Sequence, residues 1–219
     1  MVGIKLTLSA NAGLSIEMGG NRIWVDALHT RKQPGFSCVD ETLQTKMLSH
    51  PAFQKPDVIC YTHCHPDHYS RSLTEAACRI WPKAVLLLPS ETMAPFVLGD
   101  LCITFLPLPH EGAQYADTLH YGIRIRCGTE DILLTGDCAV GCADMDGMSP
   151  QVCVVDFPWI TLPKGRRVLE EKIRPEKIVA CHLPFPEDDI NHYRVSAANA
   201  ARQMENVILL HEPLQTIEI

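Results

Sequence analysis

A short run of metal-binding side chains follows a predicted strand, and this arrangement narrows the possible folds. Residues 57–62 are mostly apolar and predict a short buried strand. Directly after them come His63, His65, Asp67 and His68, four good metal ligands in a six-residue segment. Neutral imidazole suits zinc, and a carboxylate adds charge compensation. The alternative is a surface loop that is merely rich in histidine, but such a loop does not require this spacing, and burying unpaired imidazoles would be costly.

Strand and helix patterns alternate along the rest of the chain. Gly19-Gly20-Asn21 lies between two strand patterns and predicts a hairpin turn. No linker rich in proline, glycine or serine divides the 219 residues, so a single domain over residues 1–219 is expected. Sheets covered by helices are predicted. The predicted strands are 4–9, 14–17, 22–25, 57–62, 84–88, 101–106, 121–127, 131–134, 152–156, 177–181 and 207–210, and the predicted helices are 40–48, 72–81, 165–173 and 189–204.

The segment Thr62-His63-Cys64-His65-Pro66-Asp67-His68 resembles the Thr-His-x-His-x-Asp-His signature of the metallo-β-lactamase superfamily. The family pattern continues with a histidine after a strand, an aspartate in a Thr-Gly-Asp context, and a last histidine after a strand near the C-terminus. His110, Asp137 and His182 fit these positions in order. The resemblance implies an α+β fold, namely a four-layer αβ/βα sandwich in which two mixed β-sheets are flanked by helices.

The same resemblance implies a ligand set for two metal ions. One ion would be held by His63, His65 and His110, and the other by Asp67, His68 and His182, with Asp137 bridging them. Asp26 resembles an early aspartate of the family that supports the metal loop without binding metal. His120 competes with His110, but it falls at the start of the next predicted strand, which favours His110. The other histidines lack a matching context and are predicted to be surface or hydrogen-bonded residues: His29, His50, His192 and His211.

The resemblance further implies a metal-dependent hydrolase, with Asp67 as the catalytic residue that orients a metal-bridging hydroxide. Zinc is the favoured metal, and manganese and iron also suit such ligands. The substrate would be a small ester, lactone, thioester or phosphodiester. The family's di-iron reductases place glutamate at position 65 and its zinc β-lactamases place cysteine at position 137, so His65 and Asp137 argue against both. The compact chain most resembles the branch that contains L-ascorbate-6-phosphate lactonase. Two alternatives are a di-iron redox protein and a non-catalytic metal-binding or regulatory module.

Charge and composition bear on partners and location. The net charge is −7 and the basic residues are scattered, which disfavours nucleic acid as a partner. The sequence shows neither a signal-peptide pattern nor an apolar run of membrane-spanning length, so we expect a cytoplasmic protein with a small-molecule substrate and no membrane partner. The ten cysteines include no C-x-x-C pair and are predicted to be reduced, mainly in the core. The loops expected to supply the pocket are 28–37, 111–118 and 138–150, and no particular oligomeric state is predicted.

Overall fold

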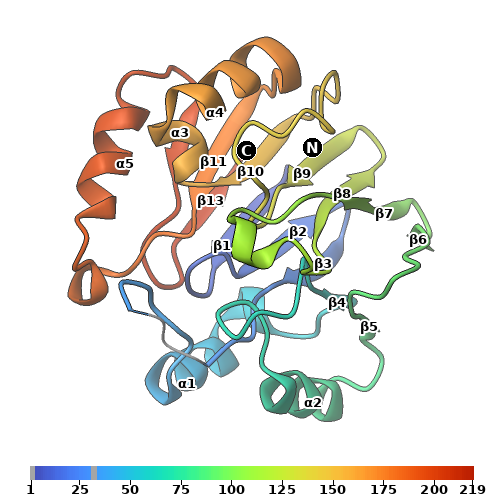
Figure 1. Cartoon of the computed structure of the whole chain (residues 1–219). Helices are drawn as coiled ribbons and strands as arrows, with labels where there is room; N and C mark the ends of the chain where they lie inside the picture. The colour runs from blue at the N-terminus through green and yellow to red at the C-terminus, as the bar shows by residue number, and fades with distance from the viewer. Residues whose placement is uncertain (1–2, 31–33) are drawn as a thin grey trace. The chain divides into compact units, whose positions relative to one another are not determined.

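The structure is a computed structural model that describes residues 3–30 and 34–219, so residues 31–33 of the expected pocket loop lie outside the described residues. The chain forms two compact units, each built around one mixed β-sheet (Figure 1). The first unit contains Met1–Pro89, His182–Asn191 and Leu210–Ile219, and the second contains Ser90–Cys181 and His192–Leu209. Each unit therefore combines segments that are far apart in the sequence.

The sheet of the first unit has the strand order β13-β1-β2-β3-β4-β5. Neighbours from β13 to β3 run antiparallel, whereas β3, β4 and β5 run parallel. Met18 pairs with Asn21, and Gly19 and Gly20 both have positive φ angles, of 54° and 78°. Glycine adopts this backbone without steric cost, and the predicted hairpin turn is confirmed. The strands are β1 (Lys5–Leu8), β2 (Leu14–Met18), β3 (Asn21–Val25), β4 (Val58–Cys60), β5 (Val85–Leu87) and β13 (Thr216–Glu218).

Two α-helices of the first unit begin at side-chain caps. Helix α1 (Glu41–Ser49) follows Asp40, whose carboxylate accepts a hydrogen bond from the backbone N–H of Leu43. Helix α2 (Arg71–Ile80) follows Ser70, whose hydroxyl accepts from the N–H of Leu73. The predicted helices at 40–48 and 72–81 are thus confirmed to within one residue at each end. The unit also contains two short 3₁₀ helices, η1 (Pro51–Phe53) and η4 (Pro186–Asp188).

The second sheet has the order β12-β11-β10-β9-β8-β7-β6, antiparallel from β6 to β9 and parallel from β9 to β12. Leu134 pairs with Val154, and Asp156 pairs with Cys181. The carboxyl ends of β9, β10 and β11 therefore lie at the same end of this sheet. The strands are β6 (Phe96–Leu98), β7 (Leu101–Pro107), β8 (Tyr121–Cys127), β9 (Glu130–Leu134), β10 (Val152–Asp156), β11 (Lys177–Cys181) and β12 (Val207–Leu209).

The helices of the second unit depart from the predicted bounds. The predicted helix 165–173 is an α-helix, α4 (Pro163–Val168), that continues as a π-helix, η3 (Leu169–Ile173). The predicted helix 189–204 begins only at Tyr193, because His192 has a left-handed backbone with φ of 57°. The remaining helices are α3 (Pro158–Thr161), α5 (Tyr193–Ala201) and the 3₁₀ helix η2 (Ala113–Tyr115). In the described part of the chain, no helix has the length and apolarity needed to cross a membrane.

Candidate metal centre

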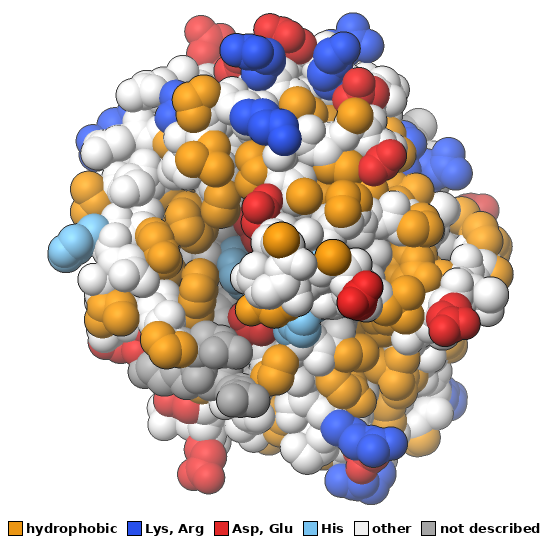
Figure 2. Space-filling model, in the orientation of Figure 1, with side chains coloured by type: hydrophobic (Ala, Val, Ile, Leu, Met, Phe, Trp, Pro, Cys, Tyr) orange, Lys and Arg blue, Asp and Glu red, His pale blue; other side chains and the backbone are white. Residues whose placement is uncertain are grey.

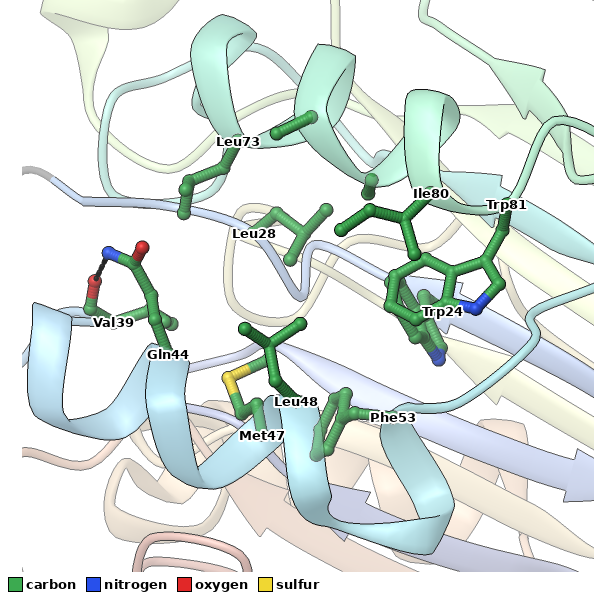
Figure 3. A pocket seen from close by; sticks show the side chains of 12 residues that line it. Trp24, Leu28, Val39, Gln44, Met47, Leu48, Phe53, Leu73, Ile80 and Trp81 are labelled. Atoms are coloured by element: carbon green, nitrogen blue, oxygen red, sulfur yellow. Dashed lines mark hydrogen bonds between the residues drawn. The ribbon is translucent and has the colours of Figure 1, made fainter.

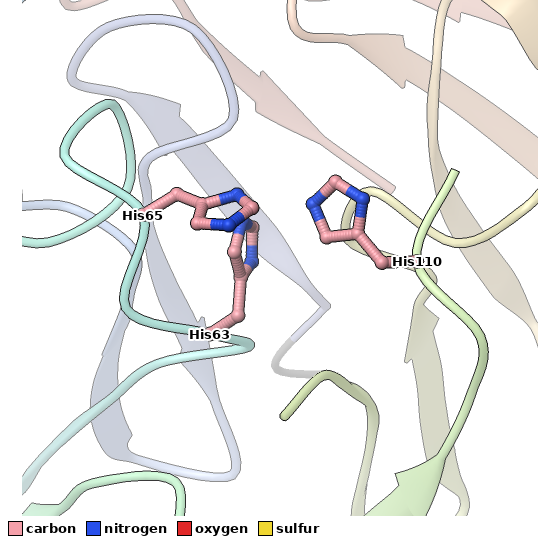
Figure 4. A group of neighbouring side chains, drawn as sticks. All are labelled: His63, His65 and His110. Carbon is pink, nitrogen blue, oxygen red and sulfur yellow. The ribbon is translucent and has the colours of Figure 1, made fainter. Parts of the chain in front are cut away.

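The loop after β4 brings three histidine rings of the first unit together. His63 and His68 are fully buried, whereas His65 and Asp67 are partly exposed. The ring centroids of His63 and His68 lie 4.1 Å apart, and those of His63 and His65 lie 4.6 Å apart. Figure 4 shows the rings of His63 and His65 side by side on this loop. Such close packing of imidazoles is typical of residues that share a metal ion.

Hydrogen bonds to Asp26 fix this loop. The Asp26 carboxylate is buried and accepts the Thr62 N–H at 2.8 Å, the Thr62 hydroxyl at 2.6 Å and His68 Nδ1 at 3.0 Å. Because β3 and β4 are parallel neighbours, with Val25 paired to Cys60, the residues that follow both strands meet at the same edge of the sheet. The backbone of Asp26 is left-handed, with φ of 50°, which turns the chain at this edge. The predicted supporting role of Asp26 agrees with these contacts.

The same hydrogen bonds define the tautomers of two histidines. A carboxylate can only accept, so His68 Nδ1 carries a proton, and in the neutral ring Nε2 then carries the lone pair. The Thr62 hydroxyl donates its single proton to Asp26, so its oxygen must accept a hydrogen bond from His63 Nδ1, 2.9 Å away. His63 Nε2 therefore also carries a lone pair. Hydrogen bonding of the second ring nitrogen is how proteins orient metal-binding histidines.

A three-residue ligand set lies wholly within the first unit. One ligand atom from each of Asp67, His68 and His182 lies within 4.8 Å of the other two. The rings of His68 and His182 are 5.2 Å apart, centroid to centroid. Two imidazole nitrogens and one carboxylate oxygen form a donor set that suits zinc and other first-row divalent metals. These buried and half-buried groups could hold a metal ion.

Asn11 holds His182 and the neighbouring loop, a role that no sequence motif indicates. Its backbone carbonyl accepts the backbone N–H of His182 at 2.9 Å. Its amide donates to the Ser37 carbonyl at 2.5 Å and accepts the Ser37 N–H at 3.0 Å. The ring of Phe36, the residue before Ser37, lies 4.7 Å from the ring of His182, centroid to centroid. One buried asparagine thus connects two segments of the first unit that carry or cover a proposed ligand.

His29 is a further buried histidine near this loop. Its Nε2 lies 3.3 Å from the Ala10 carbonyl, and its ring is fully buried. Burial, with smaller contributions from the nearby imidazoles of His68 and His182, lowers the pKa of His29 to about 3. His29 is therefore neutral at pH 7. It is one of the hydrogen-bonded histidines that the sequence predicted outside the ligand set.

In the second unit, the structure brings His110 and Asp137 together. His110 Nε2 lies 3.7 Å from an Asp137 oxygen, while His110 Nδ1 donates to the Glu111 carbonyl at 2.8 Å. The Glu111 N–H in turn donates to the Asp137 carbonyl at 2.8 Å, which joins the two loops. His120, the competing residue, is buried, and its Nδ1 donates to the Leu108 carbonyl at 3.1 Å.

The sequence missed Asp156, which ends β10 in the second unit. One of its carboxylate oxygens lies within 4.8 Å of an Asp137 oxygen. The signal that could have identified it is an aspartate at the end of an otherwise apolar strand, Val152–Asp156, next to the strand that precedes Asp137. Of the cysteines that adjoin proposed ligands, Cys138 and Cys181 are buried while Cys64 is exposed.

Solved structures of other proteins identify the fold of this chain. No protein-family model matches the chain, and no curated protein matches it. Solved structures do match it. The metallo-β-lactamase fold protein YhfI from Bacillus subtilis is 13% identical, each chain is covered over 99% of its length, and the TM-score is 0.62. The chain has the metallo-β-lactamase fold. The predicted α+β class, with two mixed sheets flanked by helices, is confirmed.

Two further structures with this fold show how widely its chemistry varies. A possible metal-dependent hydrolase from Veillonella parvula is 16% identical over the full length of both chains, with a TM-score of 0.68. CmlA, a diiron β-hydroxylase from Streptomyces venezuelae, is 13% identical, with a TM-score of 0.62, and its match covers all of this chain and 55% of CmlA. At these identities the likeness shows the metallo-β-lactamase fold, and the chemistry must be argued from the residues.

Proposed function

We propose that this chain is a metal-dependent hydrolase that uses two divalent metal ions, preferably zinc, to cleave a small ester, lactone, thioester or phosphodiester. The observation that carries the proposal is the pair of hydrogen bonds that fix His63 and His68 with lone pairs on Nε2. A structural loop would not need two buried imidazoles held in the tautomer that binds metal. The similarity of fold to metal-dependent hydrolases supports the same conclusion.

The proposed ligands come from both units. His63, His65 and His110 would hold one ion, Asp67, His68 and His182 the other, and Asp137 would bridge them. When bound, two such ions would lower the pKa of a water molecule and polarise the substrate oxygen. Each histidine on this chain contributes neutral nitrogen, and the two aspartates supply the negative charge that partly balances the ions.

Asp67 has the additional role of proton carrier in this proposal. It is half-buried, and one of its oxygens lies within 4.8 Å of the ligand atoms of His68 and His182. The second oxygen can accept a proton from the attacking water and pass it to the leaving group. Asp67→Asn should therefore lower turnover more strongly than it lowers metal content, and full activity with a full metal complement would contradict this role.

The competing proposal is a di-iron redox protein, because CmlA shows that the fold is compatible with that chemistry. The residue at position 65 favours hydrolysis on chemical grounds. A histidine there adds a neutral nitrogen, whereas a glutamate would add a negative charge that stabilises ferric iron. A colourless protein containing zinc would favour hydrolysis, and strong visible absorbance with bound iron would favour redox chemistry. Bound metal without turnover would favour a regulatory module.

The test combines metal content with turnover. Metal-free protein is incubated separately with zinc, manganese and iron, and then assayed on fluorogenic esters, lactones, thioesters and phosphodiesters. We expect about two equivalents of metal, and a rate loss of about 100-fold or more in His63→Ala. His192→Ala is the matched control, since His192 is exposed and lies outside the ligand set. Less than one equivalent of any metal would overturn the proposal.

A further inference from the structure

A small apolar pocket opens between α1 and α2 of the first unit, and none of the proposed metal ligands lines it. Its volume is about 120 Å³. Figure 3 shows the two helices facing each other across this space, with Leu48 and Met47 on α1 opposite Leu73 and Ile80 on α2. We call it the α1–α2 pocket, and its floor is Trp24 of β3.

The α1–α2 pocket has a buried floor and an apolar rim. Trp24 is 1% exposed, whereas Leu48 and Ile80 at the rim are 56% and 54% exposed. Exposed leucine and isoleucine are common singly, but here two of them flank the same opening from different helices. Covering them with an apolar molecule would remove their side chains from water, which is worth about 25 cal/mol for each Å² buried.

Aromatic rings form one end of the pocket. Trp24 and Trp81 meet edge to face, with centroids 5.0 Å apart and an interplanar angle of 85°. The ring centroid of Phe53 lies 5.8 Å from that of Trp24. These three rings line the pocket, and a further aromatic ring can pack against them in the offset or edge-to-face geometry that aromatic pairs prefer.

The side chains that line the pocket favour an uncharged ligand. Among the described residues that line the pocket, none is charged and Gln44 is the one polar side chain. The Gln44 amide donates to the Val39 carbonyl at 3.1 Å, so its oxygen is the part that can still accept from a ligand (Figure 3). A charged molecule would lose its hydration in this pocket without gaining an opposite charge, so the ligand must be neutral.

We propose that the α1–α2 pocket binds a neutral molecule with a single aromatic ring. An engineered apolar cavity of about 150 Å³ in another protein holds benzene, so a pocket of this size that also opens to solvent can take a ring with a small substituent. The site is separate from the metal centre. None of the proposed metal ligands lines it, although Leu28, which does, accepts the Ser70 N–H with its backbone carbonyl.

Toluene and benzoate test this inference as a matched pair, since both have seven carbon atoms and only benzoate is charged. Each is titrated into the full chain while the methyl resonance of Met47 and the indole N–H resonances of Trp24 and Trp81 are followed by NMR. We expect saturable toluene binding with a Kd of about 1 mM or tighter, and no saturation with benzoate. Intermolecular NOEs should connect toluene to the Met47 methyl group.

Two variants of α2 provide the control. Ala76 lines the pocket, so Ala76→Phe should fill it and weaken toluene binding by about tenfold or more. Arg79 is exposed on the same helix and does not line the pocket, so Arg79→Phe should bind as the unmodified chain does. Circular dichroism checks that both variants fold, and if Ala76→Phe does not, the NOEs from the unmodified chain decide.

Three results would overturn the inference. They are shifts that never saturate, equal binding of toluene and benzoate, or a dimer that toluene dissociates, in which case a second copy of the chain covers the pocket. Ala76→Phe should leave zinc stoichiometry unchanged, because no proposed ligand lines the pocket. Failure of toluene binding would therefore leave the metal proposal intact, and failure of zinc binding would leave the pocket proposal intact.

Discussion

Replacing Asp26 with asparagine would test whether the metal loop is held in place before any metal binds. Asparagine matches aspartate in shape but offers one acceptor oxygen instead of two. Asp26 Oδ2 accepts from both the Thr62 hydroxyl and His68 Nδ1, and Oδ1 accepts from the Thr62 N–H. Whichever way the amide is oriented, an NH₂ group must face at least one donor, so at least one hydrogen bond is replaced by a repulsive contact.

The size of the effect follows from these bonds. A hydrogen bond to a charged group contributes about 1.5–3 kcal/mol, and the lost bonds are buried, so we expect Asp26→Asn to lower the free energy of unfolding of the metal-free chain by about 2–4 kcal/mol. Depending on how the amide is oriented, His68 Nδ1 is left either with an uncharged acceptor in place of the carboxylate or with no acceptor. Loss of such a partner costs about 10- to 100-fold in metal affinity, so zinc should bind more weakly by that factor.

The assay measures both quantities separately. Competition with a chromophoric chelator gives the zinc affinity, and urea unfolding of the metal-free chain gives the stability. Asp57→Asn is the matched control, because Asp57 also accepts a backbone hydrogen bond, from the Arg22 N–H at 2.8 Å, but touches no proposed ligand. It should lose stability and keep its zinc affinity. If Asp26→Asn bound zinc as tightly as Asp57→Asn does, the argument for a preset loop would be wrong.

Three further predictions test other parts of the first unit and the core. Asn11→Ala removes both side-chain hydrogen bonds to Ser37 and should weaken zinc binding and lower stability, whereas the control Asn21→Ala should change neither. Chelator competition measures the zinc affinity, and equal affinity in the two variants would contradict a positioning role for Asn11. The pKa of His29 is lowered from 6.5 to about 3 in the folded chain, so its ring stays neutral there, whereas in the unfolded chain it takes up a proton as the pH falls below 6.5. The free energy of unfolding should therefore fall between pH 6.5 and pH 3, with a slope approaching about 1.4 kcal/mol per pH unit. Urea unfolding of the metal-free chain from pH 4.5 to 7 should show a shallower slope in His29→Gln, and an unchanged slope would refute the assignment. Cys64 is exposed, whereas burial raises the pKa of Cys153 to about 12, so iodoacetamide should label Cys64 first; peptide mapping that found Cys153 labelled earlier in the folded chain would contradict the structure.

Features that depend on local chemistry could be predicted from the sequence. The turn at Gly19-Gly20 was predictable because two consecutive positive φ angles favour glycine. Helices α1 and α2 were predictable because a capping side chain, Asp40 or Ser70, precedes an apolar stripe. The grouping of His63, His65, Asp67 and His68 required only a strand and a tight loop. Each of these features is determined within about ten residues of chain.

Features that depend on distant contacts could not be predicted. Strand β13 joins the first sheet only because Leu6 pairs with Ile217 at the other end of the chain. Asn11 looks like an ordinary turn residue until the loop at Ser37 and the segment at His182 are both in place. The late start of α5 has a related cause, since the left-handed turn at His192 interrupts a pattern that is helical by composition. Propensity is overridden in each case by packing that the local sequence does not encode.

Proposed ligands in both units have the same hydrogen-bond arrangement, in which a partner group engages Nδ1 of the histidine ring. In the first unit, Asp26 and Thr62 engage Nδ1 of His68 and His63, and in the second unit the Glu111 carbonyl engages Nδ1 of His110. All three rings therefore present Nε2 as the nitrogen with the lone pair. Surface histidines have no reason to share one tautomer, because water can satisfy either nitrogen. Each of these three rings, held by a different partner, presents an Nε2 lone pair that can bind a metal ion.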